Sequence, residues 1–174
     1  RDVLFLGHTT EHSTVHPDRI RWSDGGDPES WTSTNYFDLS TKDGDIVMGL
    51  APIQGLAVAF KRKSIWVGAY VGAPDYYTFE QVVPDKGTVA PFAIKSINNY
   101  ILFASYDGIY IFDGSPSPRK ISGKKVSNYF LSGLNEEEAY QIIAYVHPFK
   151  SEIWFCSQKG AFPTWIYNYE TDDW

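Results

Sequence analysis

The sequence has few residues that could cross-link the chain or bind a metal through sulfur. Cys156 is the single cysteine among 174 residues, which excludes an internal disulfide and a multi-cysteine metal cluster. No apolar run approaches the ~20 residues that a transmembrane helix needs, and no secretory signal pattern is visible. Nucleophile-elbow, P-loop and dinucleotide-binding motifs are also missing. The sequence therefore contains no familiar catalytic motif.

Basic residues are in the minority. There are 15 Lys and Arg against 21 Asp and Glu, so the formal net charge is −6. A tight, sequence-independent nucleic-acid binder is usually basic, so the composition disfavours that function. At 43% hydrophobic residues the chain is too apolar to be disordered. Because it starts at Arg1 with a segment that resembles a strand already under way, we expect it to be an excerpt of a longer protein.

Aromatic residues are abundant, with 11 Phe, 12 Tyr and 6 Trp, and they lie in short apolar runs separated by turn residues. This pattern predicts an all-β fold. The runs pair into hairpins, of which the clearest has the Asp107-Gly108 turn between residues 100–103 and 109–112. The hairpins recur at a spacing of about 40 to 50 residues, which is typical of four-stranded β-propeller blades.

We therefore predict about three to four blades of antiparallel four-stranded sheets, which would form part of a larger propeller. The predicted blades cover approximately residues 1–40, 41–86, 87–121 and 134–174. One short helix is predicted near 122–132, within an insert at 122–133, because Val126, Tyr129 and Phe130 would share one face.

Three histidines, His8, His12 and His16, follow one another at spacings of four. On a helix this spacing would suit a zinc site, but the surrounding Thr, Ser and Pro residues favour a solvated loop. Cys156 is expected to be a buried, inert thiol. The acidic run 136–138 is expected to be a solvated charge run, and the segment 38–45 lacks the spacing of a calcium loop. We predict no metal, cofactor or catalytic residue.

Two sets of residues are singled out. Charged hairpin tips commonly serve solubility, and they also present side chains to partners; the candidate partner contacts are Lys61, Arg62, Lys63, Tyr106 and Asp107. The candidate structural turn and blade residues are Trp22, Asp24, Trp31, Gly108, Asp113, Gly114, Trp165 and Trp174.

Several motifs occur in an order that resembles a known family. Arg-Ile-Arg-Trp-Ser-Asp at 19–24 is followed by Asp-Pro-Glu-Ser-Trp at 27–31, by Tyr-Phe-Asp-Leu at 36–39 and by Asp-Gly-Asp-Ile-Val-Met-Gly-Leu at 43–50. The segments 58–67, 87–91, 107–114, 152–155 and 165–174 continue the series. Over about residues 19–174 the chain resembles the β-propeller structural proteins of phage tails, of the tail nozzle or tail tubular protein B type, and related DNA-stabilising hub proteins.

The resemblance implies a virion structural protein without enzymatic activity, made in the cytoplasm of the host bacterium. It implies a ring of copies, with a hexamer suggested by the family, in contact with other tail or adaptor proteins. DNA would pass through the ring without specific binding. Two alternatives remain from the residues: a receptor- or glycan-binding propeller that stacks Trp and Tyr on sugars, and a propeller glycosidase. The glycosidase would need two carboxylates facing a common cleft, and no such pair stands out.

Overall fold

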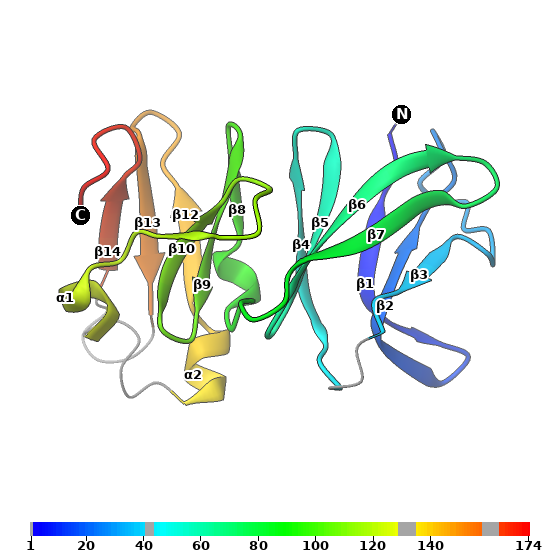
Figure 1. The fold of residues 1–174 in the computed structure, drawn as a ribbon, viewed down its shortest axis with the longest axis horizontal. Coiled ribbons are helices and arrows are strands. Elements are labelled where there is room, and N and C mark those ends of the chain that lie inside the picture. The colour runs from blue at the N-terminus through cyan, green and yellow to red at the C-terminus, as the bar shows by residue number, and fades with distance from the viewer. Residues whose placement is uncertain (1, 41–43, 129–134, 158–163) are drawn as a thin grey trace. The chain divides into compact units, whose positions relative to one another are not determined.

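The computed structural model describes residues 2–40, 44–128, 135–157 and 164–174, and most of them form β-strands (Figure 1). The strands make four antiparallel sheets, each built from strands that are consecutive in the sequence. This confirms the prediction of an all-β chain. Two sheets have four strands and two have three. That the sheets are blades of a propeller stays a prediction. No helix in the described ranges is long and apolar enough to cross a bilayer.

The chain divides into two compact units, residues 1–87 and 88–174. The first unit holds one sheet of β1 (Phe5–Glu11), β2 (Thr14–Trp22) and β3 (Tyr36–Asp38), and a second of β4 (Val47–Ile53), β5 (Leu56–Lys61), β6 (Ile65–Gly72) and β7 (Tyr76–Val83).

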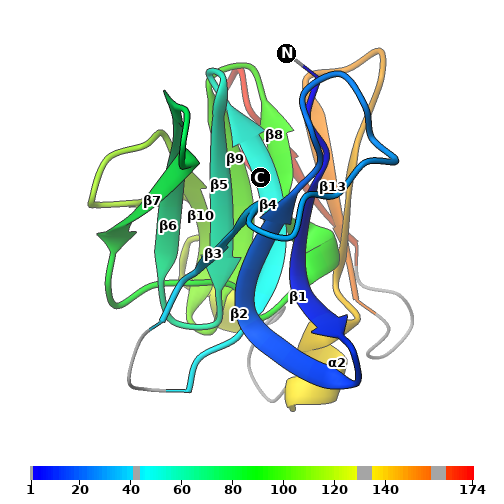
Figure 2. The same ribbon diagram turned by 90° about the vertical axis from the view of Figure 1, so that its right-hand side faces the viewer.

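Strands β1 and β2 form a long curved ribbon, which Figure 2 shows from the side. The predicted loop over residues 8–17 is therefore wrong. His12 and Ser13 both have positive φ, 47° and 69°, and make the two-residue turn that suits a hairpin. His8, with φ 57°, lies at a bulge in the ribbon, where the register shifts between Gly7 and Thr9.

The two sheets of the first unit pack face to face. Ile20 and Trp22 of β2 meet Val47, Ala59 and Phe79 of the second sheet in one buried cluster. Full burial of each large side chain contributes roughly 1.5–3 kcal/mol. The sheets approach closely at Gly7, where an added Cβ would lie 2.7 Å from Val47 Cγ1.

The second unit also holds two sheets. It contains η1 (Pro91–Ala93), the sheet of β8 (Lys95–Ile97), β9 (Tyr100–Ser105), β10 (Gly108–Phe112) and β11 (Arg119–Lys120), the helices α1 (Lys124–Val126) and α2 (Glu136–Tyr140), and the sheet of β12 (Ile143–Val146), β13 (Glu152–Cys156) and β14 (Thr164–Asn168).

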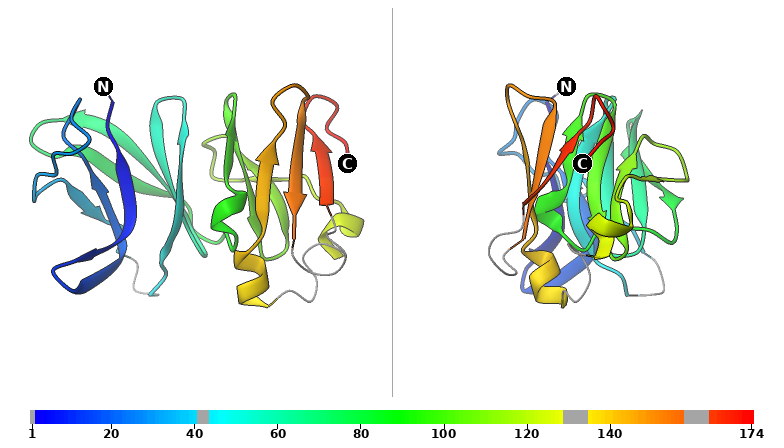
Figure 3. Two further views of the ribbon diagram at one scale, coloured as in Figure 1. Left: turned by 180° about the vertical axis from the view of Figure 1, so that it is seen from behind. Right: turned by 90° about the vertical axis from the view of Figure 1, so that its left-hand side faces the viewer.

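A buried cluster joins the sheets of the second unit. Leu102 and Ile109 of the first sheet belong to the same cluster as Ile153, Phe155 and Tyr167 of the second. The left panel of Figure 3, which shows the ribbon from behind, has α2 at one end of β12 and η1 beside that strand. Both sheets therefore share one apolar interior within this unit.

The helices differ from the prediction. The helix expected near 122–132 is present as α1, where Val126 is buried; Tyr129 and Phe130 lie outside the described residues. The run 136–138 is the first turn of α2 rather than a simple charge run. Asn135 accepts a hydrogen bond from the Glu138 backbone N–H, and the Glu138 side chain accepts one from Asn135 N–H. This capping box, Asn-x-x-Glu, is the pattern that could have predicted the helix.

Candidate partner-binding site

The turn after β2 is organised by Asp24. Its carboxylate accepts hydrogen bonds from Ser30 Oγ at 2.6 Å, from Thr32 Oγ1 at 3.0 Å and from Asn35 Nδ2 at 2.7 Å. The bond from Ser30, followed by the others, lowers the pKa of Asp24 below its usual value. At the far end of the turn Trp31 donates to Pro28 O at 3.0 Å. Asp24 and Trp31 thus serve as turn residues in the structure.

Trp22 lies in the core beside that turn. Its side chain is 3% exposed, and its Nε1 has no hydrogen-bond partner among the described residues. The ring lies 5.3 Å from that of Tyr77, at a steep angle. Trp22 therefore belongs to the buried cluster and also lies next to residues of the Asp24 turn.

The β5–β6 turn was predicted as an exposed cationic tip, and this is wrong for Lys61. Lys61 is fully buried, and its Nζ donates to Leu39 O at 3.0 Å. Arg62 is half-buried and Lys63 exposed, and both backbone N–H groups donate to the carboxylate of Asp45 at 3.0 Å. Adjacent basic residues do not reveal from the sequence which of them points inward.

The β9–β10 turn is exposed. Tyr106 is 54% exposed, and Asp107 Oδ2 accepts from Tyr110 Oη at 2.7 Å. Lys120 Nζ donates to Asp107 O at 2.5 Å. Glycine is favoured at position 108 because an added Cβ would lie 2.5 Å from the Oγ of buried Ser122, which accepts from Ile109 N. The turn therefore exposes Tyr106 to solvent, while hydrogen bonds from Tyr110 and Lys120 to Asp107 stabilise the turn itself.

The remaining predicted residues of the second unit are structural. Asp113 Oδ1 accepts from Ser115 N at 3.0 Å, and Gly114 has φ 99°, so both shape the loop after β10. Trp165 packs against the core of this unit. Trp174 does so as well, and its Nε1 donates to Ile121 O at 2.8 Å.

The structure does not gather the histidines into a metal site. No group of three or more His, Cys, Asp or Glu residues within the described ranges could hold a metal ion. Cys156 was expected to be buried, but it is only half-buried, because it lies on the outward face of β13. Its Sγ lies 3.7 Å from Thr164 Oγ1 on the next strand.

A row of apolar residues crosses that outward face. Tyr145, Trp154 and Ile166 form one row across β12, β13 and β14, in register. Tyr145 is 50% exposed and Ile166 is 41% exposed. The prediction of exposed hairpin tips missed this surface, although the alternation of apolar residues on both faces of these strands is visible in the sequence.

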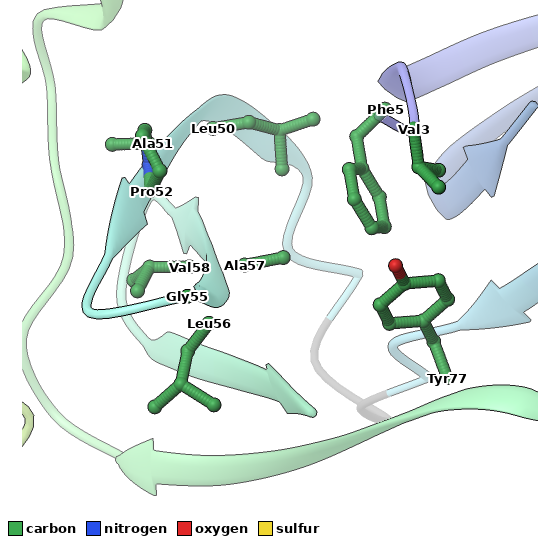
Figure 4. Close-up of a pocket in the computed structure, with 10 residues that line it drawn as sticks. All are labelled: Val3, Phe5, Leu50, Ala51, Pro52, Gly55, Leu56, Ala57, Val58 and Tyr77. Carbon is green, nitrogen blue, oxygen red and sulfur yellow. The ribbon is translucent and has the colours of Figure 1, made fainter. Parts of the chain in front are cut away.

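Two cavities lie in the first unit, and the sequence did not predict either. One, of about 380 Å³, is shown in Figure 4. It is lined by Val3, Phe5, Leu50, Ala51, Pro52, Gly55, Leu56, Ala57, Val58 and Tyr77. The Tyr77 hydroxyl is directed towards Phe5 and Val3, across from the β4–β5 hairpin. The cavity is therefore an apolar hollow between the two sheets of this unit.

The second cavity, of about 300 Å³, adjoins the first, because Val3 and Tyr77 line both. Its other lining residues are Trp22, Ser23, Asp24, Gly25, Asn35, Tyr70 and Tyr76. Here aromatic rings stand beside polar groups of the Asp24 turn. We call this space the tyrosine cavity.

Comparisons with protein-family models and with curated proteins found no match for the chain.

Proposed function

We propose that the chain is a virion structural protein of a phage tail, and that it forms part of an oligomeric hub or nozzle around the DNA channel. The observation that carries the proposal is the serial arrangement of four antiparallel sheets, over residues 5–38, 47–83, 95–120 and 143–168. Consecutive sheets of this size are what propeller blades require. The motifs that resemble tail propeller proteins follow the chain in the same order.

Exposed apolar sheet faces support an assembly of several copies. The row of Tyr145, Trp154 and Ile166 leaves an aromatic surface on the last sheet. On the first sheet, Leu6 and Tyr36 flank Arg21 on the outward face and are 44% and 41% exposed. Apolar surface of this kind marks interaction sites, and stacking of sheets from neighbouring subunits would cover it.

The charge supports passage of DNA without binding. A net charge of −6 gives little attraction for phosphate along a channel. We expect residues that face the channel in the assembled ring to be neutral or acidic. A density map of the assembly that shows a basic lining would contradict this part of the proposal.

Electron microscopy of the purified chain tests the assembly, together with light scattering to measure its mass. We expect rings with a central channel. Replacing both Tyr145 and Ile166 by serine should shift the protein towards smaller species, whereas the control Tyr106→Ser should leave the rings intact. A chain that stays monomeric at every concentration would refute the proposed ring. Saturable binding of one sugar class on a glycan array, without rings, would favour the alternative of a receptor-binding propeller.

A further inference from the structure

The walls of the tyrosine cavity are aromatic rings set at steep angles to one another. Tyr77 is the central ring: its centroid lies 5.3 Å from that of Trp22 at an interplanar angle of 62°, and 5.5 Å from that of Tyr70 at 70°. Tyr76 also lines the cavity. These rings therefore pack edge to face against one another, and they give the cavity wall several ring orientations rather than one flat stacking platform.

The cavity is open to solvent through two of its tyrosines. Tyr70 is 50% exposed and Tyr76 is 40% exposed, whereas Trp22 at the wall is buried. Its volume of about 300 Å³ is at the lower end of the range of ligand sites. The occupant must therefore be a small group, and the two exposed rings are the ones that it can reach from solvent.

A negative charge stands in the same wall. Asp24 is ionised at neutral pH, because the hydrogen bonds from Ser30, Thr32 and Asn35 lower its pKa. No cationic side chain contributes to that shift, and no ion pair to Asp24 is present in the described part of the chain. Among the described residues, the charge is therefore not neutralised by a Lys or Arg side chain.

The hydrogen bonds that Asp24 already accepts favour a cation over a sugar as the ligand of this cavity. Both carboxylate oxygens already accept from the surrounding turn, Oδ1 from Thr32 and Asn35 and Oδ2 from Ser30 and Thr32. A carboxylate has about four acceptor positions, so little capacity is left for the directed hydrogen bonds that a sugar hydroxyl needs. The charge itself remains, and it attracts a cation without a directed bond.

We propose that the tyrosine cavity binds an alkylammonium cation, held against the exposed rings of Tyr70 and Tyr76 and attracted by the Asp24 carboxylate. Aromatic faces attract cations within about 6 Å of the ring, and boxes of such rings bind quaternary ammonium groups. The apolar cavity of Figure 4 adjoins this site at Val3 and Tyr77, so the aliphatic part of the ligand has an apolar surface beside it. This inference is independent of the proposed role in a phage tail.

Titration of the 174-residue chain with choline tests the proposal, with NMR spectra of the tyrosine rings as the measurement. The matched control ligand is 3,3-dimethyl-1-butanol, which has the same shape without the charge, in buffer of equal ionic strength. We expect choline to shift the ring signals of Tyr70, Tyr76 and Tyr77 saturably, and the neutral alcohol to bind at least about fivefold more weakly. Equal binding of both compounds would show that the cavity selects shape alone, and would overturn the proposal. The absence of saturable shifts with choline would overturn it as well.

Three variants locate the site. Tyr76→Leu keeps an apolar side chain but removes the ring, and should weaken choline binding by about fivefold. Asp24→Asn should weaken it too, provided that circular dichroism shows the fold to be intact. Tyr106→Leu is the control, because Tyr106 is also an exposed tyrosine but lies on the β9–β10 turn, and it should have no effect. Unchanged affinity in Tyr76→Leu would overturn the proposal whether or not Asp24→Asn folds.

Titration with N-acetyl-lysine methylamide distinguishes two sources of the cation. Tighter binding than choline would assign the site to a lysine side chain of a partner protein, and weaker binding would assign it to a small quaternary ammonium compound. Either result supports the site, because both probes carry an alkylammonium cation, quaternary in choline and primary in the lysine derivative.

Discussion

Asp45→Ala is expected to destabilise the first unit, because Asp45 holds the β5–β6 turn. Its side chain is 7% exposed, and the carboxylate accepts from the backbone N–H groups of Arg62 and Lys63 at 3.0 Å each. These two hydrogen bonds connect positions 17 and 18 residues apart. Their loss therefore releases the turn from the segment that precedes β4.

The magnitude follows from the kind of hydrogen bond. A hydrogen bond to a charged group contributes about 1.5–3 kcal/mol. Arg62 is half-buried and Lys63 is exposed, so water can partly replace the carboxylate at both N–H groups. We therefore take the lower value for each bond and expect a loss of about 3 kcal/mol in the free energy of unfolding.

Urea unfolding at neutral pH, followed by circular dichroism, measures this loss. Asp85→Ala is the matched control, because Asp85 is an exposed aspartate of the same unit, and it should change the free energy of unfolding by less than about 0.5 kcal/mol. Asp45→Asn should fall between the two, because its amide oxygen can still accept one of the bonds. A loss below about 0.5 kcal/mol in Asp45→Ala would refute the argument, since it would mean that water replaces the carboxylate completely.

Two further predictions concern a close backbone contact and a carboxylate. Gly87→Ala should destabilise the protein by several kcal/mol in the same assay, because an added Cβ would lie 2.2 Å from Lys61 O, whereas Gly123→Ala, with nothing within 4 Å, should be nearly neutral. The lowered pKa of Asp24 implies a stabilisation that is present above the unfolded-state pKa of about 3.9 and is lost as the pH falls through the folded-state value. The wild type should therefore exceed Asp24→Asn in urea midpoint most clearly at pH 7, and the difference should shrink towards pH 2; a difference that is constant across this range would contradict the assignment.

Hairpins with a strong local turn signal could be predicted from the sequence. The Asp107-Gly108 turn is confirmed between β9 and β10. The His12-Ser13 turn was missed, since it lacks the Asn-Gly or Asp-Gly pair that usually marks a two-residue hairpin turn. The turn closes a ribbon in which Thr10 pairs with Val15 and Glu11 with Thr14. Such pairing is a property of two strands rather than of one.

The candidate site was much less predictable than the strands. The sequence predicted Asp24 as a turn residue, but it did not predict that Ser30, Thr32 and Asn35 donate hydrogen bonds to it. Asp45 was considered only as part of a segment that lacks calcium-loop spacing, and its hydrogen bonds to the β5–β6 turn were not predicted. The tyrosine cavity combines Val3, Trp22 and Tyr70, which are far apart in the sequence. No local spacing relates such residues, so their meeting depends on how the two sheets pack.

The sequence by itself determined that the chain is built of β-hairpins, because alternation and turn residues act between neighbours a few positions apart. It also determined the net charge and the shortage of sulfur ligands. Only the tertiary structure decided that Lys61 is buried while Lys63 is exposed, and that aromatic rings enclose a cavity beside Asp24. The physical reason is that burial is a property of the packed sheets: two residues of the same charge, two positions apart in the sequence, become different once one of them faces the interior.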